Sequence, residues 1–192
     1  HTEADPAALL FQFLTAFGNV IGRNAHFTAE AVKHFLKLFC LLVGDTSKGR
    51  KGTSWGYIKR IFQTIDVEWA GRNESGLTSG EGLIWAVRDP IEKQEPIKEK
   101  GKVTGYQRVI VDEGVEDKRL LVIEAEFASV LQVMGRDSNT LSAVIRNAWD
   151  DGDLSVMTKN SPAKASNAHI SINAHITKSE LNRRLDSTEA GN

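Results

Sequence analysis

The chain has 192 residues, of which 41% are hydrophobic and 26% charged, a composition that predicts one globular domain with a full core. Its formal net charge of −1 excludes a global attraction to nucleic acid or to anionic membranes, so any such contact must be local. The single cysteine, Cys40, excludes a disulfide framework and is expected to be a buried small hydrophobe in a reducing cytoplasm. No apolar stretch reaches roughly 18 residues, so neither a membrane span nor a membrane partner is predicted.

The first predicted element is a helix that begins after Asp5. Asp5 suits the N-cap and Pro6 the first helical position, and apolar residues then recur at helical spacing as far as Gly22, a stop signal. Residues 25–34 leave two alternatives open. Their alanine and glutamate favour a helix, whereas the alternation of apolar residues favours a strand.

A buried strand is predicted from Phe35 to Val43, because the run is short, apolar and ended by Gly44-Asp45. Such a run is typical of a parallel sheet covered on both faces. Apolar residues from Trp55 to Ile65 then mark a helix. A strand, a glycine-containing loop and a helix, in that order, form the arrangement that a phosphate-binding loop requires.

From Val43 the sequence reads Val-Gly-Asp-Thr-Ser-Lys-Gly-Arg-Lys-Gly-Thr-Ser. Gly44 and Gly49 have the spacing of the phosphate-binding pattern GxxxxGK(S/T), but Arg50 stands at the lysine position and Lys51 follows it. We interpret this as a variant with its lysine displaced by one residue. The alternative is a glycine-rich basic turn that binds nothing.

The variant keeps the chemistry that ATP and Mg²⁺ need. Main-chain N–H groups and the N-terminus of the following helix attract phosphate, a lysine neutralises the β- and γ-oxygens, and a hydroxyl ligates Mg²⁺. We assign the lysine role to Lys51 and the metal ligand to Thr53, with Ser54 as the second choice. The predicted nucleotide-binding residues are Gly44, Asp45, Lys48, Gly49, Arg50, Lys51, Gly52, Thr53 and Ser54.

A second strand is predicted over Arg72–Leu77, followed by a helix that opens at 78–82 and continues to Val87. Ser79 and Glu81 lie at this strand-to-helix junction, where ligands of α/β sheets bind. Glu81 facing a metal-bound water and Ser79 as a plain N-cap are equally good interpretations. Residues 90–118 are polar and are predicted to be a charged surface insertion, with a hairpin strand at 109–111 and a solvated linker at 92–102.

The segment from Arg119 to Phe127 reads Arg-Leu-Leu-Val-Ile-Glu-Ala-Glu-Phe, a buried strand (Leu120–Ile123) that ends in acids. An acid at the carboxyl end of such a strand can hold Mg²⁺, and a second can orient or deprotonate water. Glu124 is the predicted metal-side carboxylate and Glu126 the predicted base, so Lys51, Glu124 and Glu126 form the catalytic set. The alternative is two carboxylates favoured by a helix dipole.

The remaining pattern is two helices, a polar hairpin or loop, a strand and a final helix. The helices are predicted at 126–134 and 139–149, the hairpin or loop at 154–165 and the strand at 168–174. The capping box Thr177-Lys178-Ser179-Glu180 opens the final helix. Strands alternating with helices predict an α/β sandwich of three layers, with residues 1–192 as a single domain. Because the sequence starts at His1 rather than methionine and ends at Asn192 after a helix-like segment with little sign of a natural finish, we expect a fragment that lacks C-terminal elements.

Four segments in this order resemble a bacterial family of RecA-like P-loop ATPases, which occurs alone or joined to primase-polymerase modules in phage, plasmid and mobile-element proteins. They are residues 43–55, 76–84, 121–127 and 169–177. The resemblance implies a RecA-like core with a mainly parallel sheet, ATP binding and a primase-helicase-like role. It also implies that His175 senses the γ-phosphate, the alternative being a histidine at the surface. Asn173-Ala174 stand where the family usually has glycine before this histidine.

Partners are predicted from local basic residues. Arg136 and Arg146 are candidates for an arginine finger given to a neighbouring subunit in a ring-like homo-oligomer, although a solvated helix face is the commoner role. Lys159 and Lys164 are candidates for sequence-independent contacts with the phosphates of single-stranded DNA. The predicted function is an ATP-hydrolysing domain of a DNA replication protein, with a primase as partner or fused module. The alternatives are a nucleotide-dependent switch or scaffold and a degenerate domain without ligand.

Overall fold

The computed structural model describes residues 3–45, 51–157 and 163–185 of the chain. Its centre is a parallel sheet of strands β3 (Phe39–Gly44), β9 (His169–Thr177) and β6 (Arg119–Glu124), in the order β3-β9-β6. Glu74 adds an isolated parallel bridge to Val122 on the far side of β6. The register puts Gly44 opposite Thr177, so the carboxyl ends of the strands lie at one edge of the sheet.

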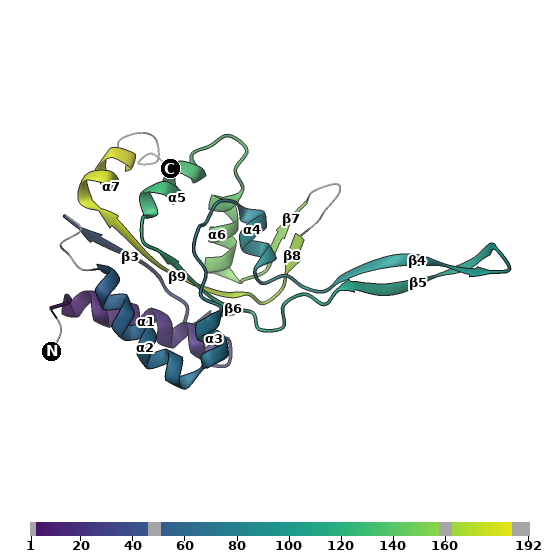
Figure 1. The fold of residues 1–192 in the computed structure, drawn as a ribbon, viewed down its shortest axis with the longest axis horizontal. Helices are drawn as coiled ribbons and strands as arrows, with labels where there is room; N and C mark the ends of the chain where they lie inside the picture. The colour runs from purple at the N-terminus through teal and green to yellow at the C-terminus, as the bar shows by residue number, and fades with distance from the viewer. Residues whose placement is uncertain (1–2, 46–50, 158–162, 186–192) are drawn as a thin grey trace.

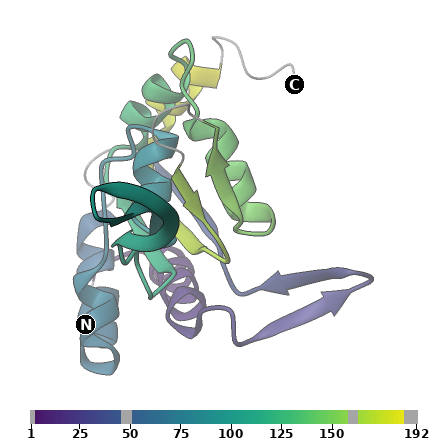
Figure 2. The same ribbon diagram turned by 90° about the vertical axis from the view of Figure 1, so that its right-hand side faces the viewer.

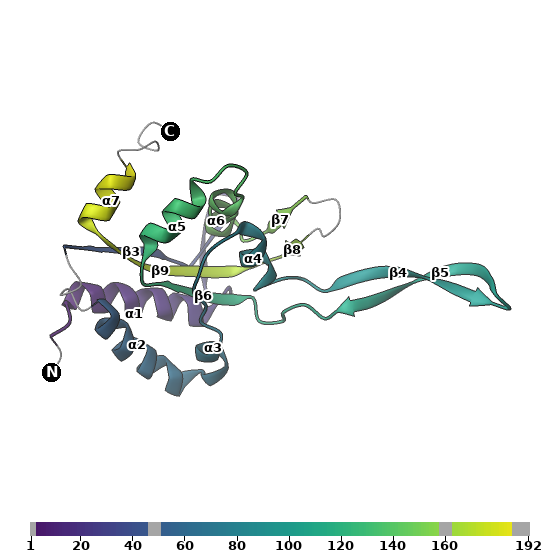
Figure 3. The ribbon, with the colours of Figure 1, turned by 45° about the horizontal axis from the view of Figure 1, so that its top comes forward.

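Helices cover both faces of this sheet (Figures 1 and 3). On one face lie α1 (Pro6–Ile21), α2 (Lys51–Ile65) and α3 (Val67–Gly71), whose core includes Phe62, Trp69 and Leu121. On the other lie α4 (Gly80–Trp85), α5 (Phe127–Met134) and α6 (Leu141–Asp150), with a larger core that includes Ile84 and Ile170. The last helix, α7 (Lys178–Leu185), directly follows β9. The structure confirms an α/β protein with a small parallel sheet.

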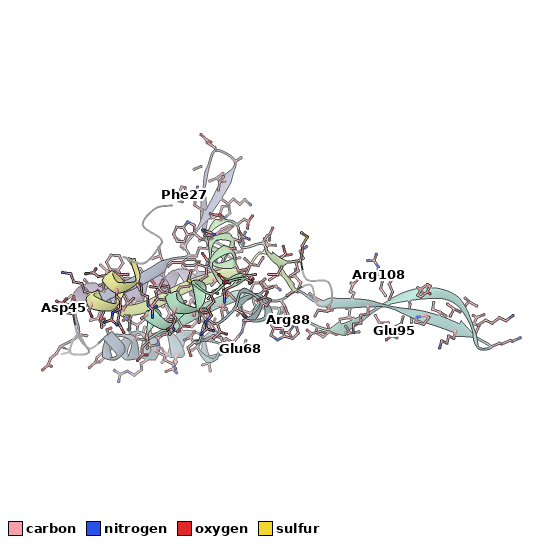
Figure 4. All side chains as sticks on the ribbon, turned by 90° about the horizontal axis from the view of Figure 1, so that it is seen from above. Phe27, Asp45, Glu68, Arg88, Glu95 and Arg108 are labelled. Carbon is pink, nitrogen blue, oxygen red and sulfur yellow. The ribbon has the colours of Figure 1, made fainter. Side chains whose placement is uncertain are left out.

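Antiparallel pairs extend from this body. Strands β1 (His26–Ala29) and β2 (Val32–Phe35) form a hairpin that projects away from it (Figures 2 and 4), and β7 (Leu154–Val156) pairs with β8 (Ala163–Ala165). The longest pair is β4 (Ile91–Glu99) and β5 (Lys102–Asp112), which we call the arm. The arm stands far out from the body (Figure 1), and positive φ angles at Lys100 and Gly101 close its turn.

The interface between α1 and the sheet is polar. Strand β9 alternates, so that Ile170 and Ile172 face the α4–α6 core while His169, Ser171 and Asn173 face α1. Helix α1 accordingly buries Gln12, Thr15 and Asn19 against the sheet. The apolar stripe of α1, which its helical spacing predicts, is therefore displaced towards the outside of the protein.

Asn19 is the centre of this interface. Its Nδ2 donates to the carbonyl oxygens of Leu120 and His169 at 3.1 and 3.0 Å, and to the hydroxyl of Ser171 at 3.2 Å. The indole Nε1 of Trp69 donates to Asn19 Oδ1 at 2.7 Å. The side-chain amide of Asn19 thus links α1 and α3 to both β6 and β9. Because all these hydrogen bonds are buried, they favour this one relative placement of the four elements.

Several local predictions are confirmed. Asp5 caps α1 through a 2.8 Å bond from Ala7 N, and Gly22, with a φ of 68°, ends the helix. The strand at 120–123, the helices near 127–134 and 141–150, the hairpin at 154–165 and the capping box at Thr177 are all present. The alternatives for 25–34 resolve as the β1–β2 hairpin.

The predicted strand Phe35–Val43 is wrong in extent and in burial. Phe35 ends β2, the chain at Leu36 crosses against α1, and β3 starts only at Phe39. This crossing requires Gly18, because a Cβ there would overlap the carbonyl oxygen of Leu36. Strand β3 is parallel as predicted but lies at the edge of the sheet, so it is only half-buried, and Cys40 with it.

Lys37 interrupts the apolar run because it caps α6. Its Nζ donates to the carbonyl oxygens of Ala148 and Asp150 at 2.6 and 3.2 Å, at the negative end of the helix dipole. Burial lowers the pKa of Lys37 to about 8.

Two other predictions are corrected, and one helix is additional. Residues 92–102, predicted as a linker, belong mainly to the two paired strands of the arm. Both faces of this pair are exposed, so its residues are polar throughout and lack the alternation of apolar residues that would predict a strand. The strand at 72–77 reduces to the bridge at Glu74, and α3 was not predicted. No helix within the described ranges is long and apolar enough to cross a membrane.

Candidate functional site at the carboxyl edge of the sheet

The candidate site begins where β3 ends. Gly44 is the last residue of β3, Asp45 follows it, and α2 begins at Lys51. Asp45 is labelled in Figure 4, at the end of the body opposite the arm. The predicted residues Lys48, Gly49 and Arg50 lie outside the described part of the chain. The strand and the helix of the predicted phosphate loop are therefore both present, and the loop between them stays a prediction.

The first turn of α2 carries the other predicted loop residues. Lys51, Gly52 and Thr53 have helical backbone, while their side chains lie outside the description. Ser54 is buried, with 1% of its surface exposed. It precedes the buried Ile58 by four residues, so both occupy the inner face of α2. The hydroxyl of Ser54 thus faces the protein interior, and the choice between Thr53 and Ser54 as metal ligand stays open.

Glu124 is buried at the carboxyl end of β6 and is held by main-chain amides. Its Oε1 accepts hydrogen bonds from the N–H groups of Gly76 and Leu77, both at 2.7 Å. These charge-assisted bonds fix the turn before α4 to the end of β6. Gly76 has a φ of 86°, a conformation that favours glycine. Within the described residues Oε2 of Glu124 accepts no hydrogen bond.

Glu126 is exposed at the N-cap of α5, and its side chain makes no capping hydrogen bond. The two predicted acids therefore have different environments. The dipole alternative suits Glu126, which directly precedes α5, but does not describe Glu124, whose carboxylate is bound to the 76–77 turn. Their assignment as metal ligand and base remains a prediction.

His175 lies near the end of β9 and is buried, not at the surface. Its Nε2 lies 3.0 Å from Nε2 of Gln12 on α1, and it stands opposite Leu42 of β3. Two residues later, Thr177 Oγ1 donates to Glu180 Oε2 at 2.6 Å and accepts from Glu180 N at 3.2 Å. This capping box starts α7 at the position in β9 that pairs with Gly44, so two helices begin near the end of β3.

The remaining candidates are dispersed. Ser79 is the N-cap of α4 and accepts a 3.0 Å bond from Gly82 N, as one of its two interpretations requires. Glu81 accepts a 3.2 Å bond from Thr140 Oγ1. Arg136 and Arg146 are exposed, as is Lys164 on β8. Lys159 lies outside the described residues.

Sequence reasoning missed the groups that contact the predicted site. Gln12 bonds His175, and the 76–77 turn binds Glu124. Asn173 was considered only as a departure from the family pattern, yet it is fully buried, and neither amide atom has a hydrogen-bond partner in the described structure. The polar and apolar alternation of residues 169–176, read with the polar Gln12, Thr15 and Asn19 of α1, was the signal that could have revealed this contact.

Among the described residues no three histidine, cysteine or acidic side chains gather closely enough to hold a metal. Mg²⁺ with a nucleotide needs no such group, because it retains water and takes phosphate oxygens beside one or two protein ligands. The residues that could supply such ligands are a hydroxyl at the start of α2 and Glu124 at the end of β6.

The fold and this edge define an α/β protein whose parallel strands end among helix N-termini and buried polar groups. No protein-family model matches the chain, and no curated protein sequence matches it at a significant level.

Proposed function

We propose that the chain is a RecA-like P-loop domain, with a three-layer core, that binds ATP with Mg²⁺ and hydrolyses it in a primase/helicase-like replication protein. One observation supports this most strongly. The helix that begins at Lys51 follows an edge-forming parallel strand, and a buried carboxylate, Glu124, ends another strand of the same sheet. In α/β sheets, ligands bind at the carboxyl ends of parallel strands, and helix N-termini there attract phosphate.

The proposed roles follow from charge. Main-chain amides of the 44–52 loop receive the phosphates, and Lys51 neutralises the charge that develops on the γ-phosphate. Mg²⁺ is held by Thr53 or Ser54 and by Glu124, whose Oε2 is the oxygen left for it. Glu126, exposed at the start of α5, orients the attacking water.

The proposed partners are single-stranded DNA and further copies of the chain. Lys159 and Lys164 would contact phosphates without reading sequence, which makes the binding salt-sensitive. Arg136 or Arg146 would supply an arginine finger to the neighbouring subunit of a ring. A primase is the proposed partner or fused module.

A nucleotide titration of the chain with and without Mg²⁺ tests the proposal. We expect Mg²⁺-dependent ATP binding that Lys51→Ala weakens by about tenfold or more, because a charge-assisted contact to phosphate is lost. Arg60→Ala is the matched control, since Arg60 is an exposed cation on the same helix. Equal affinities in the wild type, Lys51→Ala and Arg60→Ala would remove the assignment of Lys51.

A nucleotide-dependent switch or scaffold without unwinding is the second candidate. It is favoured by the two hydrogen bonds that main-chain N–H groups donate to Glu124 Oε1. A carboxylate that holds the 76–77 turn in place can shape a nucleotide-binding site without taking part in hydrolysis. The ATPase rate with and without single-stranded DNA distinguishes the two. Stimulation supports the motor, whereas tight ATP binding with no response supports the switch.

A further inference from the structure

Helix α1 is apolar on every side except the one that faces the sheet. Its sequence, Pro-Ala-Ala-Leu-Leu-Phe-Gln-Phe-Leu-Thr-Ala-Phe-Gly-Asn-Val-Ile, contains no charged residue. Its uncharged polar side chains face the sheet, so Leu10, Phe11, Leu14 and Phe17 are exposed. The apolar side of a helix is normally the side that is buried, so the exposed apolar side of α1 indicates a surface that another molecule covers.

The exposed side of α1 continues into the free edge of the sheet. A groove of about 590 Å³ runs between them, lined by Ala7 and Phe11 of α1 and by every residue of β3. Strand β3 pairs only with β9 in the described sheet, and Leu41 and Val43 on it are exposed. It has no charged residue, proline or bulge, the devices that normally prevent an edge strand from pairing with another chain.

We propose that a second copy of this chain covers this surface, with α1 packed against α1 and the two β3 edges side by side about a two-fold axis. At a two-fold axis a surface meets itself, so a charged patch would repel its own copy. The α1–β3 surface, defined by α1 and β3, largely avoids this because neither element contains a charged residue, and the one charged residue that lines the groove is Asp5, at the N-cap of α1.

The same lack of charge argues against other partners. Nucleic acid requires cations, and a helix lying on a membrane surface needs a basic polar face beside its apolar one. The polar face of α1 is uncharged and buried against β9. The surface is therefore suited to an apolar protein surface, and its own copy is one.

The apolar area of α1 accounts for part of an association surface. Five large apolar side chains of α1 are between 37% and 54% exposed: Leu10, Phe11, Phe13, Leu14 and Phe17. At about 200 Å² for each fully exposed side chain, they present roughly 440 Å² of apolar surface. Leu41 and Val43 of β3 are also exposed, but they pair with Ala174 and Ile176 of β9 and so lie on the other face of the sheet, beside the free edge. A standard interface buries about 800 Å² per partner, so α1 supplies about half of a stable contact and the free β3 edge has to supply the rest.

This contact goes beyond the proposed function, because it involves neither the arginines near α5 and α6 nor a nucleotide. Molecular mass measured by analytical ultracentrifugation over a concentration series, without nucleotide, tests it. We expect the wild-type chain to form dimers, and Leu10→Glu and Phe17→Glu to raise the dimer dissociation constant at least about tenfold. Tyr106→Glu is the control, since Tyr106 is exposed on the arm.

Cross-linking provides a second measurement that needs no charged substitution. In a Cys40→Ser background, Leu14→Cys near the axis should form a symmetric disulfide-linked dimer under mild oxidation, and Tyr106→Cys should not. This decides the question if Leu10→Glu and Phe17→Glu do not fold, as circular dichroism would reveal. A wild-type chain that stays monomeric, or a dimer that Tyr106→Glu abolishes and Leu10→Glu leaves intact, would overturn the proposal.

Discussion

Acidification should destabilise the protein through His169, which the fold keeps neutral. The ring is buried between α1 and β9, and its Nε2–H donates to the carbonyl oxygen of Gly18 at 2.9 Å. Nδ1 has no hydrogen-bond partner among the described residues. A second proton would therefore place an unsatisfied N–H and a charge in the interior, so burial lowers the pKa of His169 to about 4.

The direction and size of the effect follow from this shift. In the unfolded chain the histidine takes up a proton below about pH 6.5, whereas in the folded protein it does so only near pH 4. Its contribution is complete above pH 6.5 and is lost as the pH falls towards 4. The free energy of unfolding should fall by about 1.4 kcal/mol per pH unit in this window, to a total of about 3 kcal/mol.

Urea unfolding at several pH values between 7.5 and 5.0 measures this slope. Carboxylates whose pKa is lowered, such as Asp66 and Asp89, contribute below this window, and Lys37 titrates above it. His169→Gln should remove the slope, because the glutamine amide can donate to the same carbonyl without titrating. His34→Gln, on the exposed hairpin, is the control. Equal slopes in the wild type and His169→Gln would refute the reasoning.

Two further substitutions test the packing of α1. Gly18→Ala should destabilise the protein by about 2 to 3 kcal/mol in urea unfolding, because its Cβ would overlap main chain. Gly56→Ala, in an open position on α2, should stabilise it by about 0.5 to 1 kcal/mol, and a loss at both sites would contradict this account. Trp69→Phe should cost about 1 to 3 kcal/mol by leaving Asn19 Oδ1 unpaired, whereas Trp149→Phe, half-exposed, should cost much less in the same assay.

The sequence predicted best those features that depend on neighbouring residues. The helix start at Asp5, the N-cap at Ser79 and the capping box at Thr177 each need only a side chain and an amide a few residues away. Strand β6 was also predictable, because a run buried on both faces is apolar throughout.

Features set by distant partners were not predictable. The exposure of β3 depends on its having β9 on one side only, and the two strands are more than a hundred residues apart in the sequence. The side of α1 that packs against the sheet is polar because the facing residues of β9 are polar. The apolar stripe of α1 therefore predicted the wrong side of the helix to be buried. In the candidate site, the position of Glu124 at the end of a buried strand was predictable from the sequence. Its hydrogen bonds to the 76–77 turn were not, because they depend on tertiary structure.

The arm has a consequence for how the length of this protein can vary. Its two strands contribute nothing to either core, so residues removed in pairs from β4 and β5 would shorten it without changing the body. Between the register shifts the ladder is regular, from Glu92 opposite Ile110 to Ile97 opposite Gly105. Excising two residues from each strand there keeps every remaining side chain on its original face, whereas excising one would exchange the faces. Natural variants of this chain should therefore differ in reach by even steps.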